Sequence, residues 1–405
     1  MEGGDGAAAA AAAAAAAHSA ESELVRDDVT REAHIRYFSM FLGLVPKAYT
    51  SLDTSRLMMV YFAVNALDML GALDRLKNRQ EIIDWVYMQQ VVVVDGQNGP
   101  GCGGFLGGGF LGPMGSCSSS NSSNNNNAED EADGVSKYHQ AHVSMTYCAL
   151  LVLAILGDDY SRVDRAAAVA GLRSLQQPDG SFQAVAMGTE NDMRFVFCAC
   201  AVSFMLQDFS GIDVDKTARF ILASQSYDGG FGILPNQETH AGAIYTAVGS
   251  LALLGRLDDI DRESLERFLV SRQVQGFNGR INKVPDTCYT FWVGGSMQML
   301  NRVDWIDVES TRAFLLSCQS PIGGFSKHPG KPPEAYPDIL HSHYAVTGLS
   351  LIAEPGFAAI DCSLGITTRA YSSSSFYNKG GSGPLTGMGT PYRPPTDLQV
   401  VTTDA

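Results

Sequence analysis

A repeated pattern of one glutamine and one glycine–aromatic turn constrains the fold of this chain more than any other feature. The glutamines that mark four copies lie 48, 48 and 46 residues apart: Gln177, Gln225, Gln273 and Gln319. Each closes an amphipathic segment, and a turn such as Asp228-Gly-Gly-Phe231 follows it. Gln90 with Cys102-Gly-Gly-Phe105 is similar to an earlier copy. Repeats of this length are typical of arrays of stacked helical pairs.

A second and much more apolar segment follows each turn. Six such segments begin near these residues: Asp53, Val143, Asp192, His240, Asp286 and His341. Helices that are apolar on every side are buried, and an open solenoid would leave one side of them in water. We therefore predict an all-α fold, a closed α/α barrel (toroid) of six helical hairpin repeats with the apolar helices inside.

Composition divides the chain into one folded domain and three segments without a core. Hydrophobic residues make up 45% of the 405 residues, which is enough for one large core. We expect the barrel domain to span residues 26–362. Low-complexity composition predicts disorder in an Ala-rich tail at residues 1–25, an insertion at 107–136 and a second tail at 363–405.

The charge and the cysteines exclude several classes of protein. A net charge of −15 argues against a general nucleic-acid-binding protein. None of the 8 cysteines forms a Cys-x-x-Cys pair, which favours a reducing, cytoplasmic setting over a disulfide framework. The most apolar run, Cys148–Gly157, is only ten residues long, so we expect no stable insertion into a membrane.

The barrel prediction places the N-terminal ends of all inner helices at one end of the molecule. Polar residues near those ends are far apart in sequence but are expected to converge: Arg56, Arg194, His240, Asp286, Cys288 and His341. Helix N-termini also favour anions. We therefore expect one site that combines metal ligands with anion-binding groups around an apolar cavity.

Three residues of this set have the chemistry of a metal site. Asp286 and Cys288, together with His341 or His343, offer oxygen, sulfur and nitrogen ligands. Three protein ligands with one open position are typical of catalytic zinc. We favour His341, because His343 lies two residues further along its helix and would point elsewhere. The alternative is structural, with Asp286 as a helix N-cap and Cys288 as a core residue.

Several donors near the predicted metal site suit a diphosphate. His240, Arg280, Lys283 and Tyr289 could together neutralise two to three negative charges, although Arg280 and Lys283 also fit a solvated turn. Arg194 enters an apolar helix and needs a partner, which could equally be a structural carboxylate. Three aromatic residues could line an apolar tunnel or simply fill the core: Phe197, Tyr245 and Trp292.

The repeats and four motifs closely resemble the β subunits of the protein prenyltransferases. These motifs are Asp286-Thr-Cys-Tyr-Thr-Phe-Trp292, Gly279-Arg-Ile-Asn-Lys283, Glu238-Thr-His-Ala-Gly242 and the segment Leu340–Ser350. The resemblance covers about residues 28–355. It implies an α/α barrel that pairs with a helical-repeat α subunit and attaches an isoprenoid to a cysteine near the C-terminus of another protein.

The resemblance also assigns site residues. It implies one zinc ion per subunit, bound by Asp286, Cys288 and His341, on which a substrate thiolate forms and attacks C1 of the isoprenoid diphosphate. The diphosphate would be bound by these residues: His240, Ala241, Gly242, Arg280, Ile281, Asn282, Lys283 and Tyr289. Lys327 would stabilise the leaving group, Trp292 and Met58 would contact the isoprenoid, and Arg194 and Leu340 would contact the peptide.

Three positions favour transfer of the C20 geranylgeranyl group from geranylgeranyl diphosphate. Met58 stands where the farnesyl enzymes carry a bulky Trp, so a longer chain should fit. Leu340 replaces a Tyr, which suits C-terminal CaaX motifs with X preferably Leu, as in small GTPases. Lys327 replaces an Asp that helps to hold magnesium, so we expect catalysis without magnesium.

Four other functions fit part of the sequence pattern. A farnesyltransferase β subunit or an enzyme that accepts both lipids is the nearest alternative, and a Rab-directed enzyme has different selection rules. A terpene cyclase would need an Asp-x-Asp-Asp motif, and Asp258-Asp-Ile-Asp261 has a different order. A non-catalytic α/α scaffold that only binds partner proteins would bind neither stoichiometric zinc nor lipid.

Overall fold

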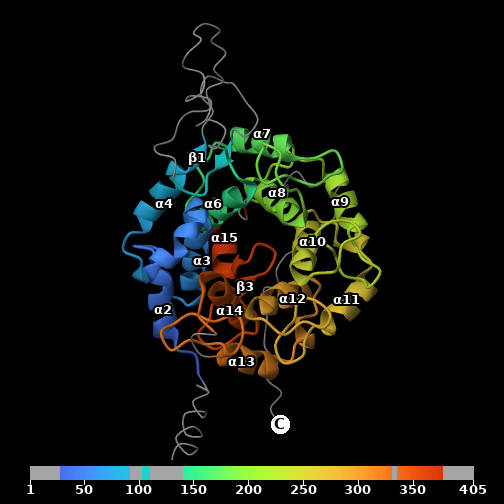
Figure 1. Ribbon diagram of the computed structural model, residues 1–405. Coiled ribbons are helices and arrows are strands. Elements are labelled where there is room, and N and C mark those ends of the chain that lie inside the picture. Colours follow the sequence, from blue (N-terminus) through green and yellow to red (C-terminus); the bar gives the residue numbers. More distant parts are fainter. Residues whose placement is uncertain (1–27, 92–102, 110–139, 331–334, 377–405) are drawn as a thin grey trace, which may run out of the picture.

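The structure is a computed structural model, and it describes residues 28–91, 103–109, 140–330 and 335–376. The tail predicted at residues 1–25 lies outside these ranges, as does the predicted insertion from residue 110 onward. In the described residues, helices alternate between an inner and an outer layer and close into a ring (Figure 1). The predicted α/α barrel is confirmed.

The inner layer consists of six helices that are apolar on almost every side. They are α3 (Arg56–Met69), α6 (Val143–Ile155), α8 (Met193–Leu206), α10 (Ala241–Leu253), α12 (Thr287–Met299) and α14 (Ile339–Leu351). Each packs against the next, and α14 packs against α3, so the ring is closed. Each inner helix contacts two inner neighbours and the outer layer, which explains why no polar face remains.

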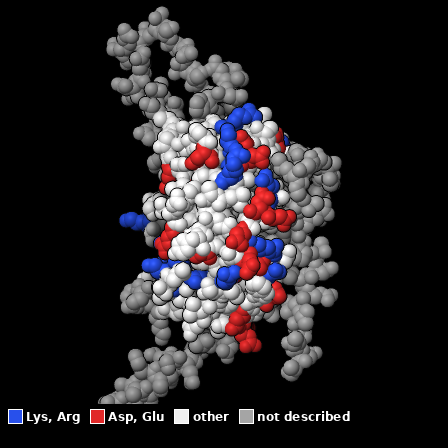
Figure 2. All heavy atoms as spheres, turned by 90° about the vertical axis from the view of Figure 1, so that its right-hand side faces the viewer, with Lys and Arg blue, Asp and Glu red and all other residues white. Residues whose placement is uncertain are grey.

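The outer layer consists of shorter, amphipathic helices. They are α2 (Arg31–Met40), α4 (Arg79–Met88), α7 (Arg165–Leu175), α9 (Val214–Ala223), α11 (Arg262–Val270) and α13 (Val308–Ser317). In α9, for example, Val214, Ala218 and Ile221 are buried at helical spacing. Figure 2 shows acidic and basic side chains intermixed on the face over α9 and α11, where Arg256 pairs with Asp215 at 3.1 Å.

Short elements complete the connections. Four 3-10 helices are described: η1 (Lys47–Ser55), η2 (Leu73–Arg75), η3 (Leu257–Asp259) and η4 (Val303–Trp305). Two antiparallel strand pairs are also present, β1 (Gln90–Val91) with β2 (Gly104–Phe105) and β3 (Ile360–Asp361) with β4 (Ile366–Thr367). The last described element is α15 (Thr368–Ser373).

The repeated glutamines connect outer helices to the next ones in the ring, in five pairs from α4–α7 to α13–α2. Gln273 accepts a hydrogen bond from the Asp307 backbone N–H at 3.0 Å and donates to the Asp307 carbonyl at 2.8 Å. Gln319 accepts from the Thr30 N–H at 2.8 Å, which joins the last outer helix to the first. In the copy marked by Gln177, the residue that makes this contact is its neighbour Gln176, so the predicted register is wrong there by one residue.

All inner helices begin at the same end of the barrel, which we call the mouth. The first or second N–H of each of five inner helices donates to a carbonyl in the loop that precedes the next inner helix. These five pairs are Leu57 to Gly107, Val143 to Ala184, Met193 to Ile233, Ala241 to Gly279 and Thr287 to Lys327. The bonds use N–H groups that a helix cannot satisfy internally and hold the loops at the mouth.

The C-terminal hairpin, which we define as residues 360–367, lies inside the ring near the axis (Figure 1). Cys362 and Leu364 are fully buried, and Phe376 is 4% exposed. The tail predicted from residue 363 is therefore wrong for residues 363–376. Its Ser- and Thr-rich composition is misleading, because Ser363 and Thr367 form hydrogen bonds with the buried Asp361 and Asp68.

Candidate metal centre

The start of α12 supplies two of the predicted metal ligands. Asp286 is the N-cap of this helix, and its Oδ1 accepts the Cys288 backbone N–H at 3.0 Å. Both side chains are buried. The structural interpretation of Asp286 is therefore correct, but it does not exclude a metal role, because a carboxylate accepts several bonds and Oδ2 is not used by the cap and lies 3.6 Å from Lys327 Nζ.

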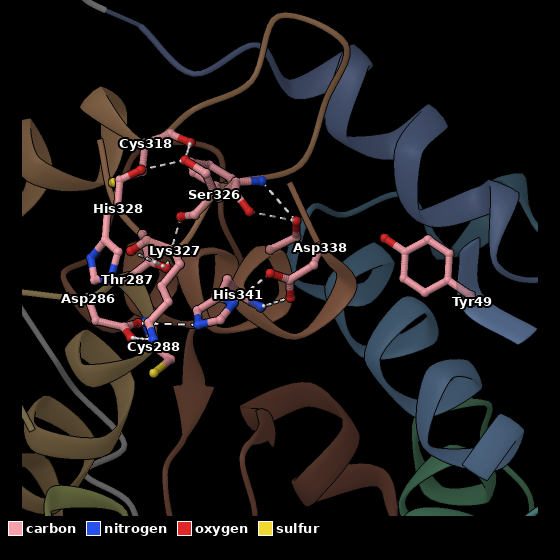
Figure 3. Close-up of polar contacts among 12 residues, drawn as sticks. Tyr49, Asp286, Thr287, Cys288, Cys318, Ser326, Lys327, His328, Asp338 and His341 are labelled. Carbon is pink, nitrogen blue, oxygen red and sulfur yellow. Dashed lines mark hydrogen bonds and ion pairs between the residues drawn. The ribbon is translucent and has the colours of Figure 1, made fainter. Parts of the chain in front are cut away.

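His341 from the start of α14 completes a compact group of three. One ligand atom each from Asp286, Cys288 and His341 lies within 4.8 Å of the other two. His341 Nε2 is 3.5 Å from Asp286 Oδ1. Figure 3 shows the two side chains pointing toward each other. Within the described ranges this is the one group of three or more His, Cys, Asp or Glu residues that could hold a metal ion.

His343, the other candidate, points away from this group. It is fully buried, its Nε2 lies 3.0 Å from Asn65 Nδ2, and its ring packs on Phe62 with centroids 4.6 Å apart. Burial lowers the pKa of His343 to about 3, so the ring is neutral. The structure therefore brings His341, not His343, together with Asp286 and Cys288.

Asp338 orients the imidazole of His341. It is the N-cap of α14, with Oδ1 accepting the His341 backbone N–H at 2.9 Å and Oδ2 lying 2.6 Å from His341 Nδ1 (Figure 3). The carboxylate thus accepts a hydrogen bond from the Nδ1–H group of His341, and Nε2 faces the other two candidate ligands. Asp338 is absent from the predicted site residues, although it occupies the N-cap position that Asp192 and Asp286 occupy in their helices.

The electrostatics of the group favour a bound cation. Burial opposes ionisation of Asp286, but hydrogen bonds from His341 and the Cys288 N–H outweigh it and lower the pKa of that carboxyl. Burial opposes the charged form of His341, yet Asp286 and Asp338 raise its pKa to about 9. Burial, together with the Asp286 charge, raises the pKa of the Cys288 thiol well above its usual range. A divalent cation would reverse this last effect.

Lys327 lies at the edge of the same group. Its Nζ is 3.6 Å from Asp286 Oδ2, and its side chain remains 54% exposed. The backbone carbonyl of Lys327 accepts the Thr287 N–H at 3.1 Å, which holds this loop against the start of α12. A cation is thus placed beside the candidate ligands and open to solvent (Figure 3).

His240 and Tyr289 form a second polar pair at the mouth. His240 is the N-cap of α10, and its Nδ1 accepts the Gly242 N–H at 2.9 Å. Because Nδ1 is an acceptor, Nε2 carries the proton of the neutral ring and donates to the Tyr289 hydroxyl at 3.1 Å. Burial and the nearby Arg280 charge lower the pKa of His240. The Tyr289 hydroxyl proton is then free to be donated to an anion.

The loop with Arg280 packs against this pair. Gly279 touches the Tyr289 ring so closely that an added Cβ would lie 2.0 Å from it. Arg280 pairs with Glu238 at 2.9 Å, and its positive charge favours the neutral form of the His240 ring. The rest of the loop is exposed, with Ile281 at 51%, a left-handed Asn282 (φ 61) and the side chain of Lys283 in solvent. The loop is solvated, as the alternative interpretation predicts, and it also lies at the mouth.

The remaining predicted residues lie on four inner helices. Met58 is half-buried in the first turn of α3, and Trp292 on α12 contacts Tyr344 with ring centroids 4.3 Å apart. Leu340 on α14 is 38% exposed and precedes His341. Arg194 on α8 is paired with Asp192 at 2.6 Å and with Glu190 at 3.3 Å, so its expected partner is a structural carboxylate.

The helices in the described ranges are all too short or too polar to cross a membrane.

Fold and site together define a closed α/α barrel that carries an Asp–Cys–His group and basic residues at its mouth. A family model described as the prenyltransferase alpha-alpha toroid domain matches residues 29–366. The chain therefore belongs to the prenyltransferase α/α-toroid family, and the resemblance noted in its sequence is confirmed.

Curated relatives refine this assignment. A geranylgeranyl transferase type-1 subunit beta from Arabidopsis thaliana is 37% identical over 353 residues, which cover 84% of this chain and 89% of the relative. The protein of the same name from Dictyostelium discoideum is 38% identical over 84% of this chain and 96% of its own length. A protein farnesyltransferase subunit beta from Schizosaccharomyces pombe is 31% identical over 80% and 78%.

A solved structure has the same fold. It is described as Candida albicans protein geranylgeranyltransferase-I complexed with GGPP, and it matches with a TM-score of 0.72. The match covers 87% of this chain and 99% of that chain at 23% sequence identity. At this identity the likeness supports the barrel architecture.

Proposed function

We propose that this chain is the catalytic β subunit of a type I protein geranylgeranyltransferase. It transfers geranylgeranyl from geranylgeranyl diphosphate to the cysteine of a C-terminal CaaX motif, with X preferably Leu. The observation that carries the proposal is the Asp286, Cys288 and His341 group at the same barrel mouth as His240, Tyr289 and Arg280. Two relatives named as type-1 β subunits, each aligned over 84% of this chain, support it.

The donor set fits one zinc ion per subunit. One carboxylate oxygen, one sulfur and one imidazole nitrogen whose other nitrogen is held by a carboxylate are typical of zinc sites with an open position. When bound, zinc lowers the pKa of a coordinated substrate thiol, so that a thiolate is present at neutral pH. Asp338 keeps His341 in the tautomer that this role requires.

The other residues at the mouth act on the diphosphate. As the sulfur–carbon bond forms at C1, the bond from C1 to the diphosphate oxygen breaks, and negative charge grows on that oxygen. The Tyr289 hydroxyl donates a hydrogen bond to the anion, while Arg280 and Lys283 contribute positive charge. Lys327 adds a further cation beside the metal ligands, so magnesium is dispensable. Ala241, Gly242, Ile281 and Asn282 line the cradle, and the Ala241 and Gly242 N–H groups hold the Gly279 carbonyl and the His240 ring in place beside the anion.

Side chains further inside the mouth select the lipid and the peptide. Met58 and Trp292 are half-buried on α3 and α12 and contact the isoprenoid. Leu340, exposed beside His341, contacts the last residue of the peptide. Arg194 keeps its pairs with Asp192 and Glu190 and offers the peptide its remaining N–H groups.

A prenyltransferase α subunit is the proposed partner. The loops that lead into the inner helices expose apolar side chains, which suit a protein surface: Met187, Ile281, Val284 and Tyr336. The heterodimer would act on CaaX proteins such as small GTPases in the cytoplasm. The barrel domain is proposed to span residues 26–376, because the C-terminal hairpin belongs to it.

The test is prenyl transfer by the chain co-expressed with a matching α subunit. Peptides ending in Cys-a-a-Leu and Cys-a-a-Ser are offered C15 and C20 diphosphates with and without magnesium, and bound zinc is measured by mass spectrometry. C20 transfer to the Leu peptide without magnesium is expected, with loss of zinc and activity in Cys288→Ala. Cys200→Ala removes an equally buried thiol away from the mouth and is the matched control.

Two results would contradict the proposal. Preference for C15 and the Ser peptide would make the chain a farnesyltransferase β subunit, and equal use of both lipids would make it a dual-lipid enzyme. No zinc and no transfer in a folded heterodimer would leave a non-catalytic α/α scaffold.

A further inference from the structure

Three consecutive residues beside the candidate metal centre are bonded to the start of α12 by backbone and side chain alike. They are Ser326, Lys327 and His328, and we call them the lysine loop. Thr287 donates its N–H to the Lys327 carbonyl and its hydroxyl to the Ser326 carbonyl, both at 3.1 Å. His328 Nδ1 lies 2.8 Å from the Pro285 carbonyl. The loop is therefore bonded to both residues that flank the candidate aspartate ligand.

The contact between His328 and Pro285 defines which nitrogen of the imidazole carries a proton. A backbone carbonyl can only accept a hydrogen bond, so Nδ1 of His328 is the donor. The ring is half-buried, and the carbonyl of His328 accepts the hydroxyl of the buried Ser326 at 2.7 Å. The side chain and the backbone of His328 are thus both fixed, and a donor at the Nδ1 position joins them to the segment that leads into α12.

The other copies of the repeat show that the fold itself does not require this arrangement. In five copies, the carbonyl that accepts the inner-helix N–H belongs to the second residue after the turn phenylalanine. These five residues are Gly107, Ala184, Ile233, Gly279 and Lys327, so one copy alone carries a charge there. The four uncharged copies hold their loops with the same backbone bond.

The next position along the repeat separates the same copy from the rest. The third residue after the turn phenylalanine is Gly108, Val185, Leu234, Arg280 or His328. Glycine, valine and leucine have no side-chain donor, and Arg280 pairs with the Glu238 carboxylate. In the part of the chain that the structure describes, His328 is thus the member of this set that bonds to a backbone carbonyl. The added bond and the added charge occur together, beside the candidate metal centre.

Lys327 depends on its backbone for its position, because its side chain is long and 54% exposed. Its Nζ lies 3.6 Å from Asp286 Oδ2 (Figure 3), and an ion pair in contact with solvent restrains a flexible side chain only weakly. A displacement of the loop by about 1 Å would carry the charge away from its working position. The bond made by His328 resists this displacement at the residue that directly follows Lys327.

We propose that His328 is a positioning residue for Lys327, because its Nδ1–H bond to the Pro285 carbonyl keeps the lysine ammonium where it meets the leaving diphosphate. This inference rests on the proposed function, since it takes Lys327 as a cation that stabilises that anion. His328 is not one of the three candidate metal ligands. Its effect on prenyl transfer passes through Lys327 and disappears when the lysine is absent.

The test uses three substitutions of His328 in the heterodimer of the full chain with an α subunit. His328→Ala removes the donor. His328→Asn keeps it, because the asparagine amide nitrogen takes nearly the position of Nδ1, whereas His328→Gln moves the amide nitrogen close to the position of Nε2. The matched control is Arg173→Ala, which removes a side-chain bond of 2.8 Å to the Ser210 carbonyl, beyond the C-terminal end of α8.

The measurements are kcat and KM for the prenyl diphosphate with a Cys-a-a-Leu peptide, bound zinc, and the affinity for inorganic diphosphate by calorimetry. His328→Ala and His328→Gln are expected to lower kcat about tenfold and to change KM less than about twofold, because charge on the leaving oxygen grows in the transition state. Inorganic diphosphate carries that charge in full and should bind about fivefold more weakly. His328→Asn, Arg173→Ala and the zinc content should match the wild type.

A double-mutant cycle with Lys327→Ala shows whether the effect passes through the lysine. Lys327→Ala alone is expected to lower kcat by about 100-fold, and adding His328→Ala should lower it no further. A residue that only stabilised the fold would lower activity in both backgrounds. If His328→Ala does not give a folded complex, the comparison of His328→Asn with His328→Gln decides the question.

The outcomes separate this inference from the proposed function. A wild-type complex that transfers the prenyl group, while His328→Ala and His328→Gln keep its kcat and diphosphate affinity, overturns the positioning role and leaves the proposed function intact. Equal losses in His328→Asn, equal losses in Arg173→Ala, loss of zinc in His328→Ala or a further fall of kcat in the double variant would also overturn it. A wild-type complex that neither binds inorganic diphosphate nor transfers a prenyl group overturns both proposals.

Discussion

The mouth and the base of the barrel both carry polar side chains, but they use them differently. At the mouth, Lys327, Tyr289 and His341 keep hydrogen-bonding or charged atoms directed toward the accessible interior. At the base, Tyr61 and Tyr245 donate to carbonyls of the chain's own hairpin. The mouth can therefore bind something else, whereas the base is already satisfied and closes the barrel.

The difference between mouth and base shows how one repeat serves two purposes. Every inner helix has at least one partly accessible residue near its start and only buried residues in its later turns, so its first turns suit ligands and its later turns suit packing. A polar residue placed early on an inner helix is available for chemistry. A polar residue placed late must find a partner within the protein, or it destabilises the fold.

His341 and His343 provide the largest test of this contrast, because they are two residues apart and face the two regions. His341→Ala is expected to abolish zinc binding and to reduce transfer by at least about 100-fold, with little change in the unfolding temperature of the zinc-free protein. His343→Ala should keep zinc but lower stability by about 2 kcal/mol, since it leaves a cavity and removes one contact of the Asn65 amide nitrogen, which keeps its hydrogen bond to the Gly365 carbonyl.

Zinc content, kcat/KM and thermal unfolding are measured on both variants in the heterodimer. The proposed division between a ligand-binding mouth and a structural base is contradicted if His343→Ala loses zinc as completely as His341→Ala. It is also contradicted if both variants change stability and neither changes zinc content.

Asp361 at the base supplies a pH test. This fully buried carboxyl accepts bonds from Ser363 and Leu364, but burial raises its pKa to about 6. The folded state therefore holds a proton that the unfolded state releases at lower pH, and stability falls as pH rises from about 4 to 6. This group contributes a loss of about 2–3 kcal/mol across that window.

Comparing the wild type with Asp361→Asn by urea unfolding from pH 4 to 7 isolates this contribution, because the amide oxygen keeps one acceptor and cannot ionise. The stability difference is expected to move in favour of the variant as pH rises. A difference that stays constant over the window would show that Asp361 is charged in the folded protein at all these pH values.

Much of this contrast is predictable from the sequence, and the failures have physical causes. The apolar character of the inner helices and their polar first turns follow from local composition, so the repeat alone suffices to group Asp286, Cys288 and His341. The hairpin at residues 360–367 escapes prediction, because its polar residues form hydrogen bonds inside the barrel. Composition alone cannot distinguish such residues from solvated ones.

Other features depend on the register between helices. Gln176 and Gln177 are adjacent and chemically identical, and only the contact with Asp213 identifies the one that joins the outer helices. The series of ring contacts from Tyr61 through Tyr147, Phe197, Tyr245 and Trp292 to Tyr344 likewise requires six helices to place one ring each at a similar depth. Asp338 is easily overlooked, because its role as the N-cap of α14 already explains why an aspartate stands at this position.

Asp338→Asn tests whether residues beyond the three proposed metal ligands organise the mouth. Loss of the carboxylate charge at 2.6 Å from His341 Nδ1 is expected to weaken zinc binding by about 10–100-fold while the shape of the side chain is preserved. Asp307→Asn makes the same change at the N-cap of an outer helix, where Oδ1 accepts the Ser310 N–H, and should leave zinc affinity unchanged.

Competition with a chromophoric chelator measures the zinc affinity of both proteins without relying on catalysis. Equal zinc affinity in Asp338→Asn and wild type would show that Asp338 acts as a helix cap and does not support zinc binding. Equal weakening in Asp307→Asn would indicate an effect on overall stability instead.

Arg280→Gln is the mildest test, because this side chain lies at the outer edge of the mouth. Arg280 is paired with Glu238 and partly exposed, so solvent screens its charge and several other donors remain for the diphosphate. Removing it is expected to raise KM for the prenyl diphosphate by about fivefold, with zinc content and unfolding temperature unchanged.

The control for this last change is Arg267→Gln, which removes an exposed arginine paired with Glu263 on α11. A KM that Arg280→Gln does not change, measured at low and at physiological salt, would place Arg280 outside the anion site and would restrict that site to His240, Tyr289 and the lysines. A rise in KM that disappears at high salt would make its role long-range attraction of the anion, because salt screens exposed charges but leaves a direct contact largely intact.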